Sequence, residues 1–358
     1  MKKIIITGGA GFIGSALVRF LVNTKGYKIL NYDALKYSGN INSLKNIKKS
    51  SRYTFVKGDI CNKRLVSKII FKFRPSIIIN CAAETHVDRS IENSYPFVKS
   101  NILGTHNLLT CSLNYFNSLD KKKKKNFLFH QVSTDEVYGD LKKKDPPSTE
   151  QSSYAPSSPY SASKASADHM VMAWYRTYGL PTVITKCSNN YGPYQYPEKF
   201  IPHIIICALN SKKIPIYGNG KQIRDWIFVE DHIKALIKVF KKNNPGKTYN
   251  IGASNQITNH ALALKICKIL KKMKIAKTEK KNLKNLVYFV QDRPGHDKRY
   301  AINSSFIKRN LGWKETESFE NGLVKTIRWY IKNQDWWKNI LKKRYSLVRL
   351  GILKKKLN

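Results

Sequence analysis

The feature that most constrains the fold is a glycine-rich turn close to the start of the chain. Residues 3–7 form a short apolar run. The glycine-rich turn begins at the last residue of this run and reads Thr7-Gly8-Gly9-Ala10-Gly11-Phe12-Ile13-Gly14. Residues 12–22 then repeat apolar side chains at helical spacing. The turn contains G-x-G-x-x-G (Gly9, Gly11, Gly14) and G-x-x-G-x-x-G (Gly8, Gly11, Gly14). Strand, glycine turn and helix in this order indicate the first unit of a β-α-β sheet.

The same turn predicts a dinucleotide site. Glycines let the backbone approach a pyrophosphate closely, and the start of the following helix offers free N–H groups with a partial positive charge. Asp33 ends the next apolar run, about 20 residues further on, where a carboxylate can accept hydrogen bonds from a ribose diol. This carboxylate favours NAD over NADP, since it would repel a 2′-phosphate; Lys36 lies nearby, and no Arg follows Asp33 directly.

Apolar runs alternate with helical segments through the first half of the chain, at 3–7, 27–32, 53–56, 76–80, 127–133 and 182–187. Continuous runs such as 4–6 and 77–79 are typical of strands buried on both faces. We therefore expect an α/β fold with a Rossmann-type doubly wound parallel sheet. Residues 1–190, with a return segment at about 225–252, would hold NAD. A smaller α/β substrate lobe would comprise 191–224 and 253–345, followed by a basic C-terminal tail at 346–358.

Composition excludes several classes of protein. A hydrophobic content of 42% over 358 residues argues against a disordered chain. The net charge of +42 raises nucleic-acid binding as a remote alternative, but Lys is scattered along the chain, which favours compositional drift and no specific nucleic-acid partner. We expect the run Lys121–Lys125 to be a solvated loop.

Targeting and redox signals point to the cytoplasm. No apolar stretch approaches the roughly 18 residues of a membrane span, and glycines interrupt the start too early for a signal peptide. The six Cys are far apart without C-x-x-C, and the eight His show no close ligand spacing. We therefore expect reduced thiols, no metal and no membrane partner.

A Tyr and a Lys supply the first catalytic candidates. Tyr160 and Lys164 stand four residues apart after Pro159, so a helix would place phenol and ammonium on one face. Tyrosine titrates near 10, and a base at neutral pH needs a pKa lower by about three units. Lys164 and the positive nicotinamide are candidates for that shift. The plain alternative is a surface Tyr beside a Lys.

Two adjacent acids follow the fifth apolar run, in Thr134-Asp135-Glu136, where the carboxyl edge of the sheet should open. Oxidising an alcohol needs one proton shuttled by Tyr160, with the Thr134 hydroxyl assisting. Two further acids indicate that a proton also leaves carbon while a hydroxyl departs. The alternative is a helix start with favourable acids in its first turn.

These motifs together resemble the extended short-chain dehydrogenase/reductase family, and within it the NAD-dependent sugar-nucleotide epimerases and 4,6-dehydratases. Further pieces of the resemblance are A-A-E-T-H-V-D-R-S at 82–90, S-T-D-E-V-Y-G-D at 133–140, Y-A-P-S-S-P-Y-S-A-S-K-A-S at 154–166, C-S-N-N-Y-G-P-Y at 187–194 and D-R-P-G-H-D at 292–297. The T-D-E signature favours the dehydratases, because the epimerases lack that acid pair. The segments 141–153 and 256–261 depart from the family pattern.

The resemblance implies site residues by position. Catalysis would use Thr134, Asp135, Glu136, Tyr160 and Lys164. Cofactor contacts would come from Gly8, Gly11, Phe12, Ile13, Gly14, Asp33, Lys36, Asp59, Ile60, Ala82, Ala83, Glu84, Ser100, Tyr160, Lys164 and Asn190. Substrate contacts would come from Thr85, Thr134, Asn189, Glu198, Lys199, Pro215, Tyr217, Arg224, Asn259, Arg293 and His296.

The implied reaction has three stages on a nucleotide sugar, with dTDP-glucose as the implied substrate. Tyr160 takes the C4 hydroxyl proton during oxidation, Glu136 takes the C5 proton while Asp135 protonates the departing C6 hydroxyl, and the hydride returns to C6. NAD would stay bound and be regenerated in each turnover, in deoxysugar (rhamnose) precursor synthesis. UDP-glucose as substrate and a C4 epimerase remain alternatives. A homodimer would form through helices at 101–115 and 162–178.

Overall fold

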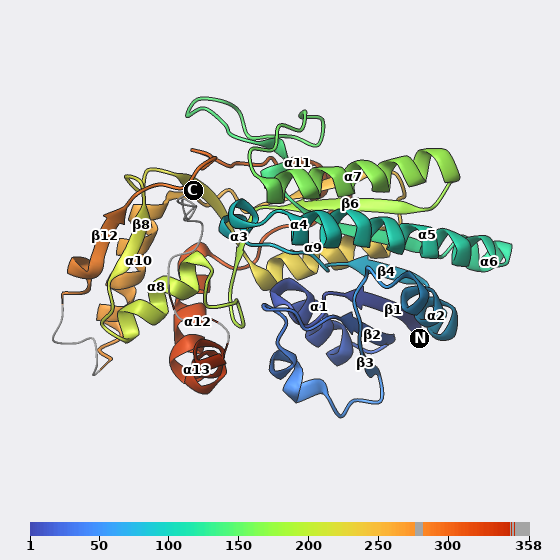
Figure 1. Ribbon diagram of the computed structural model, residues 1–358, viewed down its shortest axis with the longest axis horizontal. Helices are drawn as coiled ribbons and strands as arrows, with labels where there is room; N and C mark the ends of the chain where they lie inside the picture. The colour runs from blue at the N-terminus through green and yellow to red at the C-terminus, as the bar shows by residue number, and fades with distance from the viewer. Residues whose placement is uncertain (276–281, 344, 346, 348–358) are drawn as a thin grey trace, which may run out of the picture.

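The computed structural model describes residues 1–275, 282–343, 345 and 347 of the chain. Of the expected C-terminal tail at 346–358, all but Leu347 lies outside the described residues. Figure 1 shows a larger part built on a long sheet and a smaller part beside it.

The larger part contains a seven-stranded sheet in the order β10-β6-β5-β4-β1-β2-β3, and every pair in it is parallel. The expected doubly wound parallel sheet is therefore confirmed. Ile4 of β1 pairs with Ile29 on one side and with Ile77 on the other, so the isoleucine runs fill the middle of the sheet. The strands are β1 (Lys2–Thr7), β2 (Tyr27–Asp33), β3 (Tyr53–Lys57), β4 (Ile77–Asn80), β5 (Leu128–Thr134), β6 (Thr182–Cys187) and β10 (Thr248–Ile251).

Helices cover both faces of this sheet and enclose two cores (Figure 1). One face packs against α1 (Phe12–Asn23), α9 (Val229–Lys242) and α11 (Ser305–Leu311). The other packs against α2 (Lys63–Phe73), α5 (Gly104–Asn117) and α7 (Pro159–Tyr178). Shorter helical turns complete this part: η1 (Ile41–Ile47), α3 (Val87–Glu92), α4 (Tyr95–Phe97), the π-helical η2 (Val98–Leu103), α6 (Lys121–Lys124) and η3 (Asp135–Tyr138).

The smaller part has a core of its own. It holds a three-stranded sheet of β7 (Asn189–Tyr191), β9 (Ile223–Phe228) and β11 (Gln256–Thr258), and a parallel pair of β8 (Ile214–Tyr217) and β12 (Val287–Val290). Its helical elements are α8 (Phe200–Leu209), α10 (Asn259–Lys272), η4 (Leu283–Leu286), α12 (Phe319–Lys332) and α13 (Gln334–Lys343). Between its segments, the chain returns through α9 and β10 to the large sheet.

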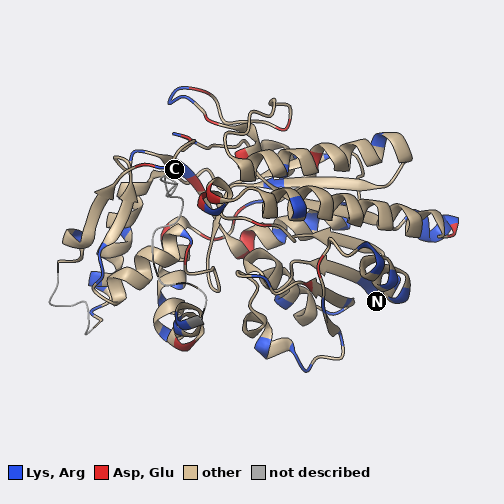
Figure 2. Ribbon diagram, in the orientation of Figure 1, with Lys and Arg blue, Asp and Glu red and all other residues tan. Residues whose placement is uncertain are grey.

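One local expectation is wrong. The run Lys121–Lys125 begins with the short helix α6, and is not a loop. Asp120 caps this helix, because its carboxylate accepts the Lys123 N–H at 2.8 Å and pairs with Lys123 Nζ at 2.7 Å. Figure 2 shows Lys and Arg spread over the helices and loops of both parts, with α6 as one close group.

The loop at 141–153, at the top of Figure 1, is bound to the segment around Arg299. The Arg299 guanidinium donates to the carbonyls of Lys142, at 3.1 Å, and Asp145, at 2.8 Å.

All six cysteines are free thiols. Among the described residues, no helix has the length and apolar character needed to cross a bilayer.

Candidate active site

Two adjoining cavities open at the carboxyl edge of the large sheet. The first, called here the cofactor cavity, is lined by the glycine turn and by the ends of β2, β4, β5 and β6. The second, called here the substrate cavity, lies toward the smaller part. Both are lined by Thr85, Glu136, Asn189, Asn190, Gln195 and Lys199, so they communicate across Glu136.

The glycine turn can hold only glycine at two of its positions. Gly8 has φ +68°, and a Cβ there would lie 2.6 Å from the backbone nitrogen of Ala82. A Cβ on Gly14 would lie 2.2 Å from the carbonyl oxygen of Gly8. The start of α1 therefore packs directly against the turn, and its backbone lines the cofactor cavity.

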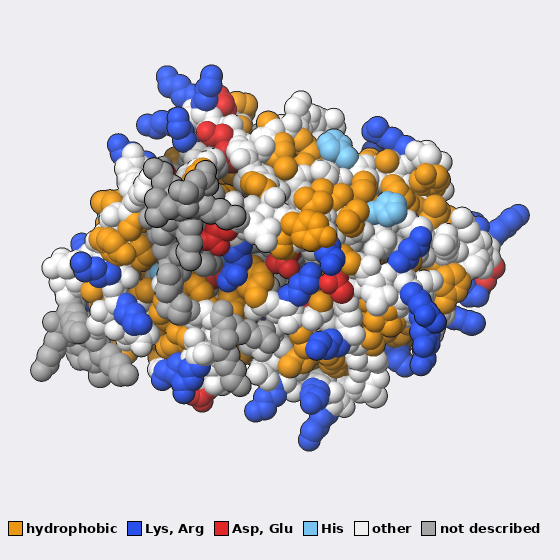
Figure 3. All heavy atoms as spheres, in the orientation of Figure 1, with side chains coloured by type: hydrophobic (Ala, Val, Ile, Leu, Met, Phe, Trp, Pro, Cys, Tyr) orange, Lys and Arg blue, Asp and Glu red, His pale blue; other side chains and the backbone are white. Residues whose placement is uncertain are grey.

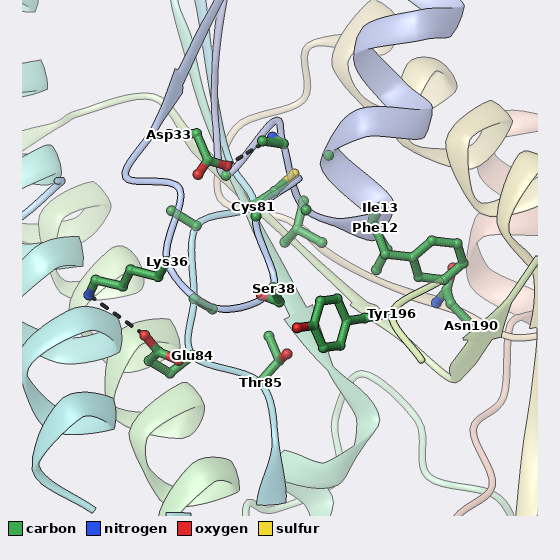
Figure 4. Close-up of a pocket in the computed structure, with 18 of the residues that line it drawn as sticks. Phe12, Ile13, Asp33, Lys36, Ser38, Cys81, Glu84, Thr85, Asn190 and Tyr196 are labelled. Atoms are coloured by element: carbon green, nitrogen blue, oxygen red, sulfur yellow. Dashed lines mark hydrogen bonds and ion pairs between the residues drawn. The ribbon is translucent and has the colours of Figure 1, made fainter. Parts of the chain in front are cut away.

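Asp33 fixes this turn as well as lining the cavity. Its carboxylate accepts the N–H of Ala10 at 2.8 Å and the N–H of Leu35 at 2.7 Å. Figure 4 shows the bond to the turn, with Lys36 facing Glu84 across the loop. Lys36 Nζ lies 3.3 Å from Asp59 and 3.6 Å from Glu84. These contacts join the ends of β2, β3 and β4.

Every cofactor residue implied by the resemblance lines the cofactor cavity. The cavity is also lined by residues that the sequence motifs did not single out as ligands, from the end of β2, from loops and from α13: Tyr32, Ser38, Cys81, Tyr194, Tyr196 and Trp336. Tyr196 points its hydroxyl toward Ser38 and Thr85 in Figure 4. The glycine turn, the start of α1 and the Asp33 carboxylate together fit a dinucleotide with a free ribose diol.

Tyr160 and Lys164 occupy the first turns of α7, which Ser158 begins with a capping box closed by Ser161. Lys164 Nζ donates to the Val132 carbonyl at 2.8 Å. Taken together, the protein's own groups do not lower the pKa of Tyr160: burial, and then the Glu136 carboxylate, raise it well above its usual value. Burial also lowers the pKa of Lys164. These surroundings favour the neutral phenol, so Tyr160 must lose its own proton before it can accept one from a substrate hydroxyl.

The acid pair begins η3, directly after β5. Thr134 caps this turn by accepting the Glu136 N–H, and its hydroxyl donates to Asp135 at 3.3 Å. Burial and the neighbouring Glu136 and Asp225 carboxylates raise the pKa of Asp135 well above its usual range. Burial also raises the pKa of Glu136, but Arg293, Arg224 and Lys199 oppose that rise. The surroundings thus favour a protonated Asp135 beside a Glu136 that faces three cations.

The substrate cavity gathers cations around Glu136. Arg293 pairs with Asp88, which also accepts the Tyr217 hydroxyl at 2.8 Å. Arg224 donates to the Asp297 carbonyl at 2.8 Å. Every substrate residue implied by the resemblance lines one of the two cavities. The substrate cavity is also lined by residues that the sequence motifs did not indicate as substrate ligands: His86, Asp88, Phe200, His203, Trp226, Tyr300 and Tyr345.

Comparison with known proteins decides the family. A family model described as GDP-mannose 4,6 dehydratase matches residues 5–326. A dTDP-glucose 4,6-dehydratase of Escherichia coli is 50% identical over 360 residues, covering 98% of this chain and 99% of the relative. The chain belongs to the 4,6-dehydratase family. A dTDP-glucose 4,6-dehydratase of Neisseria meningitidis is 49% identical over 352 residues, with 98% and 99% covered.

Solved structures agree with this assignment to the dehydratases. The dTDP-glucose 4,6-dehydratase of Bacillus anthracis in complex with NAD has a TM-score of 0.83 and 43% identity, covering 95% of this chain and 100% of the other. That of Streptomyces venezuelae, with NAD and TYD bound, has a TM-score of 0.85 and 36% identity, covering 94% and 99%. A UDP-glucose 4-epimerase of Thermotoga maritima shares the fold at a TM-score of 0.80 with 27% identity, covering 93% and 99%.

Proposed function

We propose that this dehydratase converts dTDP-glucose to dTDP-4-keto-6-deoxyglucose and water, with NAD held throughout the cycle. The observation that carries the proposal is the pair of the buried Asp135 and the partly buried Glu136, which lines the cofactor cavity with Tyr160 and faces the cations of the substrate cavity. Relatives of this chain named for the same reaction, and their structures with NAD, support it. Formation of deoxysugar precursors such as that of rhamnose is the role that we propose for the product.

Tyr160 takes the C4 hydroxyl proton in the first stage, with Thr134 beside it. NAD, when bound, accepts the C4 hydride and later returns it to C6. Lys164 supplies a positive charge below the ring, which favours the phenolate form that accepts the C4 proton. The resulting C4 ketone acidifies the hydrogen at C5.

Glu136 and Asp135 divide the second stage. Glu136 is the base for the C5 proton, since Arg293, Arg224 and Lys199 favour its charged form. Asp135 donates a proton to the departing C6 hydroxyl, since burial and neighbouring carboxylates favour its protonated form. After the hydride returns to C6, Glu136 gives its proton back to C5. Glu136 is then ionised again, and the cycle closes when Tyr160 releases the proton it took from the C4 hydroxyl and Asp135 takes up one proton, so that the protons balance.

The lining of the substrate cavity suits the nucleoside diphosphate half of the substrate. Arg224, Arg293 and Lys199 suit a diphosphate, because guanidinium groups bind phosphate oxygens in pairs. Phe200, Trp226 and Tyr345 offer flat apolar surfaces suited to a base. Thymine and uracil differ by one methyl group, worth about 1–3 kcal/mol in an apolar pocket.

Parallel incubations test the proposal. The purified protein is given dTDP-glucose, UDP-glucose and GDP-mannose in turn, and the products are measured by mass spectrometry. We expect loss of one water from dTDP-glucose at the highest kcat/KM. A product of unchanged mass would identify a C4 epimerase, and preference for another nucleotide would correct the substrate.

We also propose that the protein is a cytoplasmic homodimer. Six free thiols are compatible with a reducing compartment. Exposed apolar side chains at Tyr95, Val98, Leu103 and Tyr178 lie along α4, η2 and α7. Figure 3 shows hydrophobic side chains gathered over this region of the surface. A self-complementary pairing of that face would bury them.

A further inference from the structure

A carboxylate beneath Lys164 has no role in the proposed mechanism. Asp168 lies on α7, so Tyr160, Lys164 and Asp168 share one helix face at intervals of four residues, and all three are buried. One oxygen of Asp168 accepts the Ser133 hydroxyl at 2.6 Å and the Tyr154 hydroxyl at 3.3 Å. Its other oxygen has no hydrogen-bond donor among the described residues.

Lys186 brings a second buried cation to this network from β6. Its Nζ donates to the Tyr138 hydroxyl at 2.8 Å. It also lies 4.3 Å from the centre of the Tyr138 ring and 4.4 Å from that of Tyr154. The Tyr138 hydroxyl in turn donates to Asn250 at 2.9 Å. Lys186 is therefore fixed among aromatic rings, and Asp168 is the carboxylate that interacts with both buried lysines.

The charges of these groups depend on one another. Burial lowers the pKa of Lys164, and Asp168 is the main influence that opposes this. Burial raises the pKa of Asp168, and Lys164, Ser133, Lys186 and Tyr154 oppose that rise. Other titratable groups act on the network from neighbouring elements: Cys187 on β6, Cys81 after β4, and Glu150, which acts on Lys186.

We propose that Asp168 is a positioning residue that keeps Lys164 charged beneath Tyr160, and that Lys186 is a second cation facing the same carboxylate. The inference rests on the proposed function, in which Tyr160 takes a proton at C4. Without the carboxylate, Lys164 would be a buried cation with no counter-charge, and its neutral form would be favoured. A neutral Lys164 cannot favour the phenolate, so Tyr160 would become a weaker base.

Two variants of the same buried network should act in opposite directions on the pH profile of kcat/KM. Asp168→Asn removes the counter-charge of Lys164, so the alkaline limb should move to lower pH by about one unit or more, with kcat at neutral pH about tenfold lower. Lys186→Met removes a cation near Asp168. Asp168 is still ionised at alkaline pH in this variant and still balances the charge of Lys164, so the alkaline limb should stay where it is or move to higher pH. Asp168→Glu keeps the charge and should restore most of the wild-type profile.

A second measurement needs neither substrate nor activity. Below its pKa, charged Lys164 destabilises the folded Asp168→Asn variant more than the wild type, and this penalty disappears as the pH rises toward about 10.4. The Tm deficit of Asp168→Asn should therefore shrink with rising pH. Tyr154→Phe removes a hydrogen bond to Asp168 but no charge, so its Tm deficit should not depend on pH in this way.

The proposal is overturned if the alkaline limb moves to lower pH in both Asp168→Asn and Lys186→Met, or if the Tm deficit of Asp168→Asn is independent of pH. If Asp168→Asn does not fold, the pH profile of Lys186→Met is the remaining test. A shift of its alkaline limb to lower pH contradicts the proposal. A wild type without activity on nucleotide sugars would refute the proposed function, while the Tm comparison would still test the link between Asp168 and Lys164.

Discussion

At the scale of single residues, burial assigns different protonation states to chemically similar groups. Asp135 and Glu136 are adjacent in the chain, and burial raises the pKa of both. The difference comes from what each side chain faces, since carboxylates surround Asp135 and cations surround Glu136. An acid and a base can therefore stand side by side at one pH.

Replacing each acid by its amide should separate the steps of the reaction. Glu136→Gln should lose exchange of the C5 hydrogen with solvent deuterium, because no base remains there. Asp135→Asn should keep that exchange and lose water elimination, each loss being about 10²–10⁴-fold. Both variants should keep C4 oxidation, which is measured as transient reduction of the bound nicotinamide. Glu92→Gln, on an exposed carboxylate of α3, is the control. Equal loss of oxidation and elimination would contradict the roles assigned.

At the scale of elements, the cofactor cavity depends on how closely α1 approaches the turn before it. Backbone atoms of Gly8 and Gly14 contact each other and the start of the loop after β4. Asp33 then ties β2 to this turn through Ala10. The geometry of the turn is thus set by backbone packing, with little room for any side chain.

Gly14→Ala should abolish retention of the cofactor, because its Cβ would lie 2.2 Å from the Gly8 carbonyl oxygen and displace the helix start. The nucleotide released from purified, denatured protein measures this. Gly179→Ala is the matched control: Gly179 has φ +67° with no atom near its Cβ position, so the change costs about 1–2 kcal/mol of stability and leaves the cavity intact. Cofactor retained in full by Gly14→Ala would refute the packing argument.

At the scale of the whole molecule, the apolar face of η2 and α7 predicts the oligomer. Leu103 is 52% exposed and Tyr178 is 53% exposed. The double change Leu103→Glu and Tyr178→Glu should convert a dimer to a monomer, because burying two carboxylates there is costly. Sedimentation velocity measures the mass. Phe289, also 52% exposed but on β12, provides the control Phe289→Glu. An unchanged dimer in the double variant would exclude this face.

Acid should destabilise the whole fold through two buried histidines. Burial lowers the pKa of His130 and of His232 to about 3. Between about pH 6.5 and pH 3 the unfolded chain binds protons that the folded protein does not, so stability falls as the pH falls through this window. His130→Gln removes one of these sites. Its Tm should therefore fall less than that of the wild type between about pH 7 and pH 4. An equal fall would argue against a neutral His130.

The sequence by itself determined the sheet and the chemistry of the main motifs. Short continuous apolar runs are typical of strands buried on both faces, and a glycine turn between a strand and a helix is typical of a dinucleotide site, so both signals are local. Tyr160 and Lys164 needed only helical spacing to share a face. The ligand residues could be predicted from the sequence because whole motifs of the chain resemble those of a known family.

Only the tertiary structure decided which charges those residues carry and which distant side chains join them. Asp88 meets Arg293, and Lys186 comes near Asp168, through contacts between segments far apart in the chain. The raised pKa of Tyr160 has the same kind of cause, since burial and the nearby Glu136 carboxylate both disfavour the phenolate. Electrostatic energies depend on distance and desolvation, and neither is fixed until the chain has packed.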